Sequence, residues 1–238
     1  MVTGTENLLG EFIGTTVLLV FGCGVCANLT LEKSKGQASG WVNIAIGWGF
    51  AVTLGVFTAT TLGAPQGDLN PAVTFAKMLV GIYTFPQFLM TSLVQILGGI
   101  LGATIVWLTY LPHWAETKDP AAKLGVFCTA PAIRNIPCAF LTELIATFFL
   151  MFVIWMIFSK PVGNMVPGYG PYIVGVLIWA LGLSLGGPTG YAMNPARDLG
   201  PRIAHAILPI AGKGGSDWGY ALVPIVAPLC GTGLAYVV

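Results

Sequence analysis

The chain has 238 residues, of which 55% are hydrophobic and only 8% are charged. Soluble domains have about 25% charged residues, so this composition excludes an ordinary water-facing surface and predicts an integral membrane protein. The net charge of +1 offers no basic surface for nucleic acid, and the 32 glycines are typical of helices that pack closely in lipid.

Six apolar stretches are candidates to cross a bilayer as helices, which takes about 20 residues each. They are 8–28, 42–62, 85–111, 137–158, 171–185 and 218–238. Between them lie a short charged loop at 30–40, a long polar loop at 112–136 and a Pro/Gly loop at 159–170. We therefore expect an all-α membrane protein with six transmembrane helices in a single domain, residues 1–238.

Two further segments, 71–81 and 195–208, are mildly apolar but too short to span. Each begins within a copy of Asn-Pro-Ala, namely Asn70, Pro71, Ala72 and Asn194, Pro195, Ala196. Asn is a strong helix N-cap, and Pro fits the first helical position. Helices of about eleven residues cover roughly half of the hydrocarbon thickness. We expect re-entrant half-helices that line a wet cavity or are buried in protein.

The two halves of the chain repeat. Residues 11–15 and 143–147 both follow the pattern Glu-x-Ile-x-Thr, and each half continues with a span, a Gly-rich loop, Asn-Pro-Ala and another span. Because each half has three spans, the second half enters the membrane from the opposite face, as an inverted repeat. We place the repeats at about 6–111 and 137–238, linked by loop 112–136. The half-helices then meet N-terminus to N-terminus near the midplane.

This meeting point has a defined chemistry. Each half-helix N-terminus brings roughly half a positive charge, and the amides of Asn70 and Asn194 add N–H donors. A passing water or hydroxyl group is turned to accept hydrogen bonds from both amides, which interrupts a proton-conducting file, while a cation is repelled. The alternative is that both Asn only cap buried helices.

Arg197 directly follows the second motif. A charged side chain at membrane depth costs about 2.5–3.5 kcal/mol on insertion scales, so Arg197 needs a water-filled lining or a partner. Its five donors suit a constriction that strips hydration from neutral solutes. The alternative is an ion pair with Asp198, a residue that could instead satisfy first-turn N–H groups of the half-helix.

Glu11 and Glu143 occupy matching positions inside spans. We expect each to accept hydrogen bonds from the N–H groups of a re-entrant loop. Neither a nucleophile nor a metal-ligand cluster accompanies them, so the sequence indicates no enzyme and no cofactor. His113 and His205 lack a second ligand at useful spacing, and we expect both at the surface.

The paired Asn-Pro-Ala motifs, the Glu in the first and fourth spans and Arg197 together resemble the aquaporin (major intrinsic protein) family over essentially the whole chain. The resemblance implies a right-handed bundle of six spans and two half-helices, a pore in each protomer, a homotetramer, and cytoplasmic termini in the cell membrane. Most basic loop residues fall in odd-numbered loops, and the positive-inside rule alone would place the termini outside.

Within the family, Asn-Pro-Ala-Arg-Asp resembles the glycerol-facilitator branch. The resemblance implies a selectivity filter of Trp48, Gly182, Tyr191 and Arg197. Water-selective members usually have His on the fifth span, so Gly182 is expected to leave that corner empty and the pore wider. Trp48 could otherwise face lipid or the core. The implied solute-binding carbonyls belong to Gln66, Gly67, Asp68, Gly190, Tyr191 and Ala192, with Glu11, Glu143 and Asp198 as loop supports. Two residues depart from the branch: Tyr191 replaces Phe, and Asp68 replaces His.

These observations predict a passive channel for glycerol and related small neutral solutes, with some water, that excludes protons and ions. A water-selective pore is disfavoured by Trp48 and Gly182. A coupled secondary transporter also has inverted repeats and broken helices, but two neutral Asn at the midplane offer it no titratable or cation-binding centre.

Overall fold

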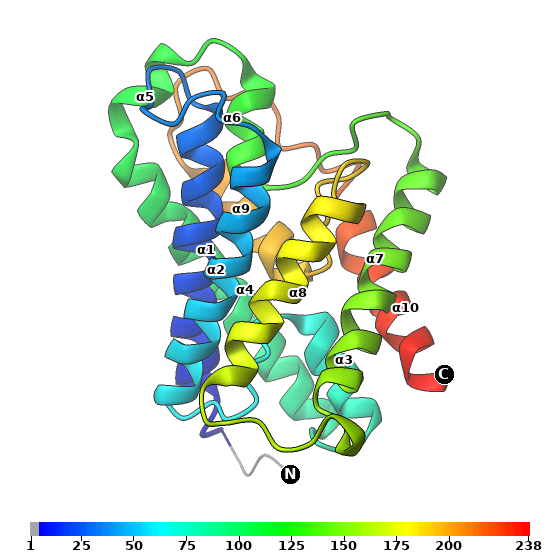
Figure 1. The fold of residues 1–238 in the computed structure, drawn as a ribbon. Coiled ribbons are helices and arrows are strands. Elements are labelled where there is room, and N and C mark those ends of the chain that lie inside the picture. Colours follow the sequence, from blue (N-terminus) through cyan, green and yellow to red (C-terminus); the bar gives the residue numbers. More distant parts are fainter. Residues whose placement is uncertain (1–4) are drawn as a thin grey trace.

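A computed structural model describes residues 5–238, and the regular structure within them is helical (Figure 1). The helices follow the order α1 (Leu8–Thr30), α2 (Trp41–Thr61), α3 (Pro71–Leu79), α4 (Phe85–Thr109), α5 (Leu111–Glu116), α6 (Pro120–Phe127), α7 (Ile136–Ile157), α8 (Tyr169–Leu185), α9 (Pro195–Ile207) and α10 (Val223–Val237), with a 3₁₀ turn at Lys160–Val162.

The six expected spans are present with small shifts at their ends. Helices α1, α2, α4 and α7 are long and apolar enough to cross a membrane, and α8 and α10 are shorter apolar helices. Helix α10 starts at Val223 instead of 218, because residues 217–222 form turns in which the N–H of Tyr220 bonds to the carbonyl of Asp217 at 3.0 Å. In Figure 1, α1 begins and α10 ends toward the same side of the view, as an even number of crossings requires.

The segment 112–136 was expected to be a long polar loop, and this expectation is wrong. It contains most of α5 and all of α6, each with a proline in its first turn, where a missing N–H costs nothing. The carboxylate of Asp119 caps α6 by accepting the N–H of Ala121 at 2.8 Å. Trp114 of α5 and Phe127 of α6 are buried, with ring centroids 5.6 Å apart. The buried aromatic pair, not the polar composition, determines the local structure.

The two short helices are where the Asn-Pro-Ala motifs predicted them. Helix α3 ends at Leu79 and α9 at Ile207, close to the expected ends at 81 and 208. With 9 and 13 residues, neither is long enough to span a bilayer. Both begin with proline directly after the capping asparagine, so the same local rule fixes both starts.

The two halves of the molecule pack in matching ways. Helix α1 lies against α2 and α4, and α7 lies against α8 and α10, while the short helices cross over, α3 onto α10 and α9 onto α4. A Cβ on Gly102 of α4 would lie 2.6 Å from the carbonyl oxygen of Thr16, and one on Gly231 of α10 would lie 2.4 Å from that of Leu144. The backbones therefore approach closely, which brings the loops before α3 and α9 together.

Candidate functional site

The asparagines of the two motifs join the re-entrant loops to each other. The Oδ1 of Asn70 accepts the N–H of Ala72 at 2.9 Å, and the Oδ1 of Asn194 accepts the N–H of Ala196 at 2.9 Å, so each caps its own helix. The Nδ2 of Asn70 donates to the carbonyl of Met193 at 2.8 Å, and that of Asn194 donates to the carbonyl of Leu69 at 2.7 Å. Because an amide nitrogen has two N–H donors, one N–H of each asparagine is not used by these contacts.

The two buried glutamates hold the loops from behind. Glu11 accepts the N–H groups of Asp68 and Leu69, both at 2.8 Å, and Gln95 donates to the same carboxylate at 2.9 Å. Both glutamate residues have 0% exposure. In a membrane, backbone N–H groups of an irregular loop find no water, so a carboxylate with two oxygens is a suitable acceptor for adjacent N–H groups.

Glu143 repeats this arrangement in the second half. It accepts the N–H groups of Ala192 at 2.9 Å and Met193 at 2.8 Å, and the hydroxyl of Thr189 at 2.6 Å. Tyr191 and Met193 have positive φ angles of 38° and 47°, a backbone conformation that costs of order 1–3 kcal/mol per residue. The bonds to Glu143 offset part of this cost.

A cavity of about 510 Å³ passes along the two loops. The loops provide a polar wall that includes both motif asparagines and every residue of the expected carbonyl lines: Gln66, Gly67, Asp68, Asn70, Gly190, Tyr191, Ala192 and Asn194. The long helices provide an apolar wall: Leu18, Val52, Val56, Leu150, Ile154, Val174 and Ile178. Trp48 and Arg197 also line the cavity. One wall can therefore contact C–H groups while the other binds hydroxyl groups.

Trp48 and Arg197 lie against each other in this lining. The guanidinium carbon of Arg197 is 4.1 Å from the centroid of the Trp48 ring, a cation–π contact. Arg197 Nη1 donates to the carbonyl of Phe127 at 3.2 Å, which fixes the guanidinium in place. Phe127 lies at the end of α6, in the segment that the sequence analysis took for a loop, so this acceptor was missed.

The corner beside Gly182 is occupied, contrary to the expectation that it is empty. A Cβ on Gly182 would lie 2.7 Å from Cζ and 2.8 Å from the hydroxyl oxygen of Tyr191. Trp41, which the sequence analysis missed, donates from Nε1 to the carbonyl of Gly182 at 2.8 Å and meets the Tyr191 ring edge-on, with centroids 5.8 Å apart. Glycine is needed here to admit the tyrosine ring, so the corner is filled by a residue from the loop.

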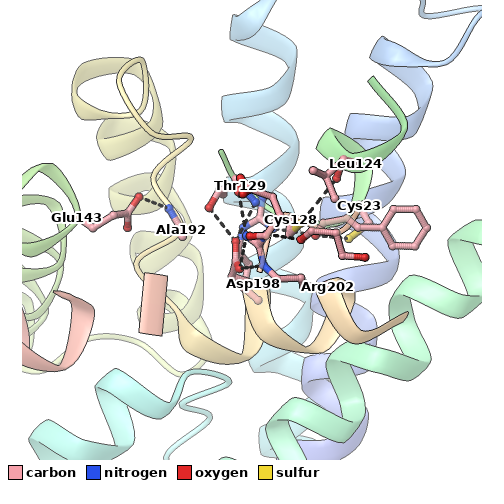
Figure 2. A network of polar contacts seen from close by, with 12 residues as sticks. Cys23, Leu124, Cys128, Thr129, Glu143, Ala192, Asp198 and Arg202 are labelled. Carbon is pink, nitrogen blue, oxygen red and sulfur yellow. Dashed lines mark hydrogen bonds and ion pairs between the residues drawn. The ribbon is translucent and has the colours of Figure 1, made fainter. Parts of the chain in front are cut away.

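Asp198 and Arg202 together hold the neighbouring segment at Thr129, as Figure 2 shows. Arg202 Nε donates to Asp198 Oδ1 at 2.8 Å, and both side chains are fully buried. Asp198 Oδ2 accepts the N–H of Thr129 at 2.8 Å and its hydroxyl at 2.7 Å, and Arg202 Nη2 donates to the Thr129 carbonyl at 2.9 Å. The alternatives of an Arg197–Asp198 pair and of first-turn N–H groups as partners are both wrong; the i,i+4 spacing of Asp198 and Arg202 was the available signal.

The expectation for His205 is also wrong. Its ring is fully buried, with Nδ1 2.9 Å from the hydroxyl of Ser216 and the ring edge-on to Phe127 at 5.3 Å between centroids. His113 is half-buried, and its Nδ1 lies 3.0 Å from the carbonyl of Glu32. Both histidines contact loop residues, and neither lines the cavity.

Comparisons with known proteins agree with this geometry. Residues 2–238 match the family model described as Major intrinsic protein. The chain is 52% identical over 228 residues to "Glycerol uptake facilitator protein 3" of Lactiplantibacillus plantarum, covering 96% of this chain and 93% of that protein. It is 41% identical over 234 residues to the "D/L-lactic acid transporter" of the same organism, with 97% and 94% covered.

A solved structure is similar over nearly the whole length. The X-ray structure of the aquaglyceroporin from Plasmodium falciparum superimposes with a TM-score of 0.85 at 28% sequence identity, and the match covers 98% of this chain and 94% of that one. The arrangement of six spans and two half-helices is therefore that of this family.

Proposed function

We propose, from the premise that this chain belongs to the major intrinsic protein family, that it is a passive channel for glycerol and related small neutral solutes. The observation that carries the proposal is the cavity with one apolar and one polar wall. Glycerol has a C–H edge and a hydroxyl edge, so it can contact both walls at once. Relatives at 49–52% identity over more than 90% of this chain are named glycerol uptake facilitators.

In this proposal the filter is formed by Trp48, Tyr191 and Arg197. Trp48 and the Tyr191 ring contact the carbon chain, and Arg197 donates hydrogen bonds to the hydroxyl groups. Gly182 contributes by its lack of a side chain. Backbone carbonyls of the loop residues that line the cavity then accept hydrogen bonds from the solute along its path.

Asn70 and Asn194 act at the midpoint of the cavity. Each has one N–H engaged by the opposite loop and one free to donate to a solute oxygen. A water molecule held by both donors points its own hydrogens away from the centre, which breaks the file along which protons would hop. The positive ends of the two half-helices repel cations at the same point.

The experiment is solute entry into proteoliposomes followed by stopped-flow light scattering. With glycerol outside, vesicles that contain the protein are expected to re-swell well above the rate of empty vesicles. With an impermeant sugar outside, shrinkage reports water flow alone. Fast shrinkage in sugar without glycerol entry would contradict the proposal and favour a water-selective pore.

A second candidate solute is protonated lactic acid. It is favoured by one observation, the similarity to a protein named D/L-lactic acid transporter. The neutral acid is of similar size to glycerol and also has an apolar and a polar edge. Uptake of labelled lactate that rises as external pH falls, at a rate above empty vesicles, would support this solute; uptake equal to empty vesicles would exclude it.

The oligomeric state and the orientation in the membrane are part of the same proposal. By resemblance to the family, we propose a homotetramer in the cell membrane with cytoplasmic termini, and two repeats at about 6–111 and 137–238. Cross-linking in native membranes tests the tetramer, with a ladder that stops at four copies as the expected result. Protease access to a C-terminal tag in sealed right-side-out vesicles tests the orientation; cleavage there would place the termini outside.

A further inference from the structure

The cavity wall contains an ion pair that the function proposed above leaves unused. Lys77 lies in the last turn of α3, and Asp68 lies two residues before Asn70; both line the cavity. Lys77 Nζ donates to Asp68 Oδ1 at 2.5 Å. The same ammonium donates to the carbonyl of Gln66 at 3.2 Å. One of the expected solute-binding carbonyls therefore already accepts a hydrogen bond from a side chain of the protein.

Within this pair, the ammonium is the part open to the cavity. The side chain of Lys77 is 15% exposed, whereas that of Asp68 is 0% exposed. The second carboxylate oxygen of Asp68 accepts the hydroxyl of Thr74 at 3.0 Å. Each carboxylate oxygen thus has its own donor, and Lys77 covers the acid on the side that a solute passes.

The acids at this end of the cavity outnumber the bases. Glu11 accepts the N–H of Asp68 at 2.8 Å and is fully buried, so a second carboxylate lies close behind the first. Among the described residues that line the cavity, the only other basic side chain is Arg197, which lies against Trp48. Lys77 is therefore the cation in the described lining that balances the charge of Asp68, the acid that lines the cavity.

We propose that Lys77 is a selectivity residue of the channel: by neutralising Asp68, it prevents this end of the cavity from attracting protons and other cations. The inference rests on the proposed channel function. Acidic side chains in a pore favour cations, and an uncompensated carboxylate would oppose the positive potential of the two half-helix N-termini. Lys77 thereby makes a carboxylate in the pore wall compatible with a channel for neutral solutes.

The test compares Lys77→Met, Asp68→Asn and the double variant with the unmodified protein in proteoliposomes that contain a pH-sensitive dye. A pH step is applied with the membrane potential clamped, and glycerol entry is measured on the same vesicles. Lys77→Met is expected to raise the proton leak by about 10-fold, since one unit charge is uncompensated near the pore. The double variant, in which neither charge remains, is expected to leak protons at the rate of the unmodified protein. Asp68→Asn alone is expected to leave the proton leak no higher than in the unmodified protein.

Two results would overturn the inference. One is a Lys77→Met channel that admits glycerol but leaks protons no faster than the unmodified protein; the other is an equal leak in Lys77→Met and the double variant, which would indicate a damaged fold instead of a charge effect. If Lys77→Met yields no folded protein, the same proton-leak measurement is made on Lys77→Gln, whose neutral amide can still donate hydrogen bonds to Asp68 and to the carbonyl of Gln66. A leak no faster than that of the unmodified protein would then overturn the inference. Failure of the channel function itself is distinct, since it would appear as absent glycerol entry in the unmodified protein.

Discussion

The two re-entrant loops share a backbone plan and differ in the side chains that they place in the cavity. In both, a buried glutamate accepts two successive N–H groups, and the motif asparagine donates to the other loop. Counted from that asparagine, Gly67 and Val73 of the first loop correspond to Tyr191 and Arg197 of the second. All four line the cavity, so at these two positions only the second loop has an aromatic ring and a cation.

The acidic residues of the two loops also differ in whether they line the cavity. In the second loop, Asp198 is buried behind the wall with Arg202 and fixes a neighbouring segment. In the first loop, Asp68 belongs to the lining and pairs with Lys77. The repeated residues thus build the scaffold of both loops, whereas the residues that the copies do not share give the two loops different side chains in the cavity. We expect the latter residues to determine which solute passes.

The largest effect, a loss of stability, is expected from replacing the buried glutamates that the two loops have in common. Glu143→Gln replaces one acceptor oxygen by an amide donor that faces the N–H of Ala192 or Met193, and we expect a loss of about 3 kcal/mol of stability and most of the folded yield. Glu11→Gln is expected to cost less, because it also removes the repulsion between Glu11 and the nearby Asp68 carboxylate. Thermal unfolding in detergent, monitored by the loss of monodisperse protein, measures the stability of both variants.

Two outcomes would contradict this expectation. Equal losses in the two variants would mean that the Asp68 carboxylate has no influence on Glu11, and that the loops are alike in energy as well as in geometry. A Glu143→Gln protein that folds in normal yield but conducts no glycerol would assign the carboxylate a direct part in permeation.

Arg197→Val gives the second loop the side chain that the first loop has at Val73. It removes the cation and the hydrogen-bond donors from the filter together, so we expect the proton leak to rise by about 10-fold, measured with the vesicles that contain the pH-sensitive dye. The matched control is Arg134→Gln, which removes the same charge from an exposed pair with Asp217 outside the cavity. An equal effect of both variants would mean that total charge, not the filter, determines selectivity.

Gly182→His tests the part played by the Tyr191 ring, which has no counterpart at Gly67 of the first loop. The structure leaves no room for a Cβ beside the Tyr191 ring, and we expect the ring to shift toward the cavity. We expect glycerol entry to fall by about 10-fold and water flow by less, given overpacking costs of 1–3 kcal/mol. Gly187→Ala is the control, because a Cβ there meets nothing within 4 Å. Equal losses of glycerol and water flow would place Gly182 outside the filter.

The parts of the fold that could be predicted from the sequence are those that depend on residues adjacent in the chain. The six spans follow from apolar stretches of sufficient length, and the half-helix starts follow from Asn capping and Pro at the first position, since both depend on adjacent residues only. The prediction of the fold and of the family is confirmed. The roles assigned to individual pore residues stay predictions, although the structure brings Trp48, Tyr191 and Arg197 to one cavity.

Apart from the i,i+4 pair of Asp198 and Arg202, whose spacing was an available signal, the failures concern contacts between residues that are far apart in the chain. Nothing in the sequence indicates that the carbonyl of Phe127 accepts a bond from Arg197, or that the ring of Tyr191 lies against Gly182 and Trp41. Such contacts are set by helix packing, which brings residues together from opposite ends of the chain. The helices within 112–136 were missed although local signals were present, namely a proline in the first turn of each helix and Asp119 as the cap of α6.

Tyr191→Phe is the finest test of the comparison, since it removes one atom that distinguishes the second loop. The hydroxyl is buried and makes no hydrogen bond with the described residues, so its removal is expected to stabilise the protein by up to about 1 kcal/mol. The ring, which fills the corner beside Gly182, remains, so glycerol entry is expected to change by less than about 2-fold. Tyr220→Phe is the control: its hydroxyl is likewise buried without such a bond, but Tyr220 does not line the cavity. Unfolding in detergent and glycerol entry are measured for both. If Tyr191→Phe alone lowers glycerol entry strongly, the hydroxyl binds the solute, and the second loop differs from the first by a specific hydrogen bond as well as by shape and charge.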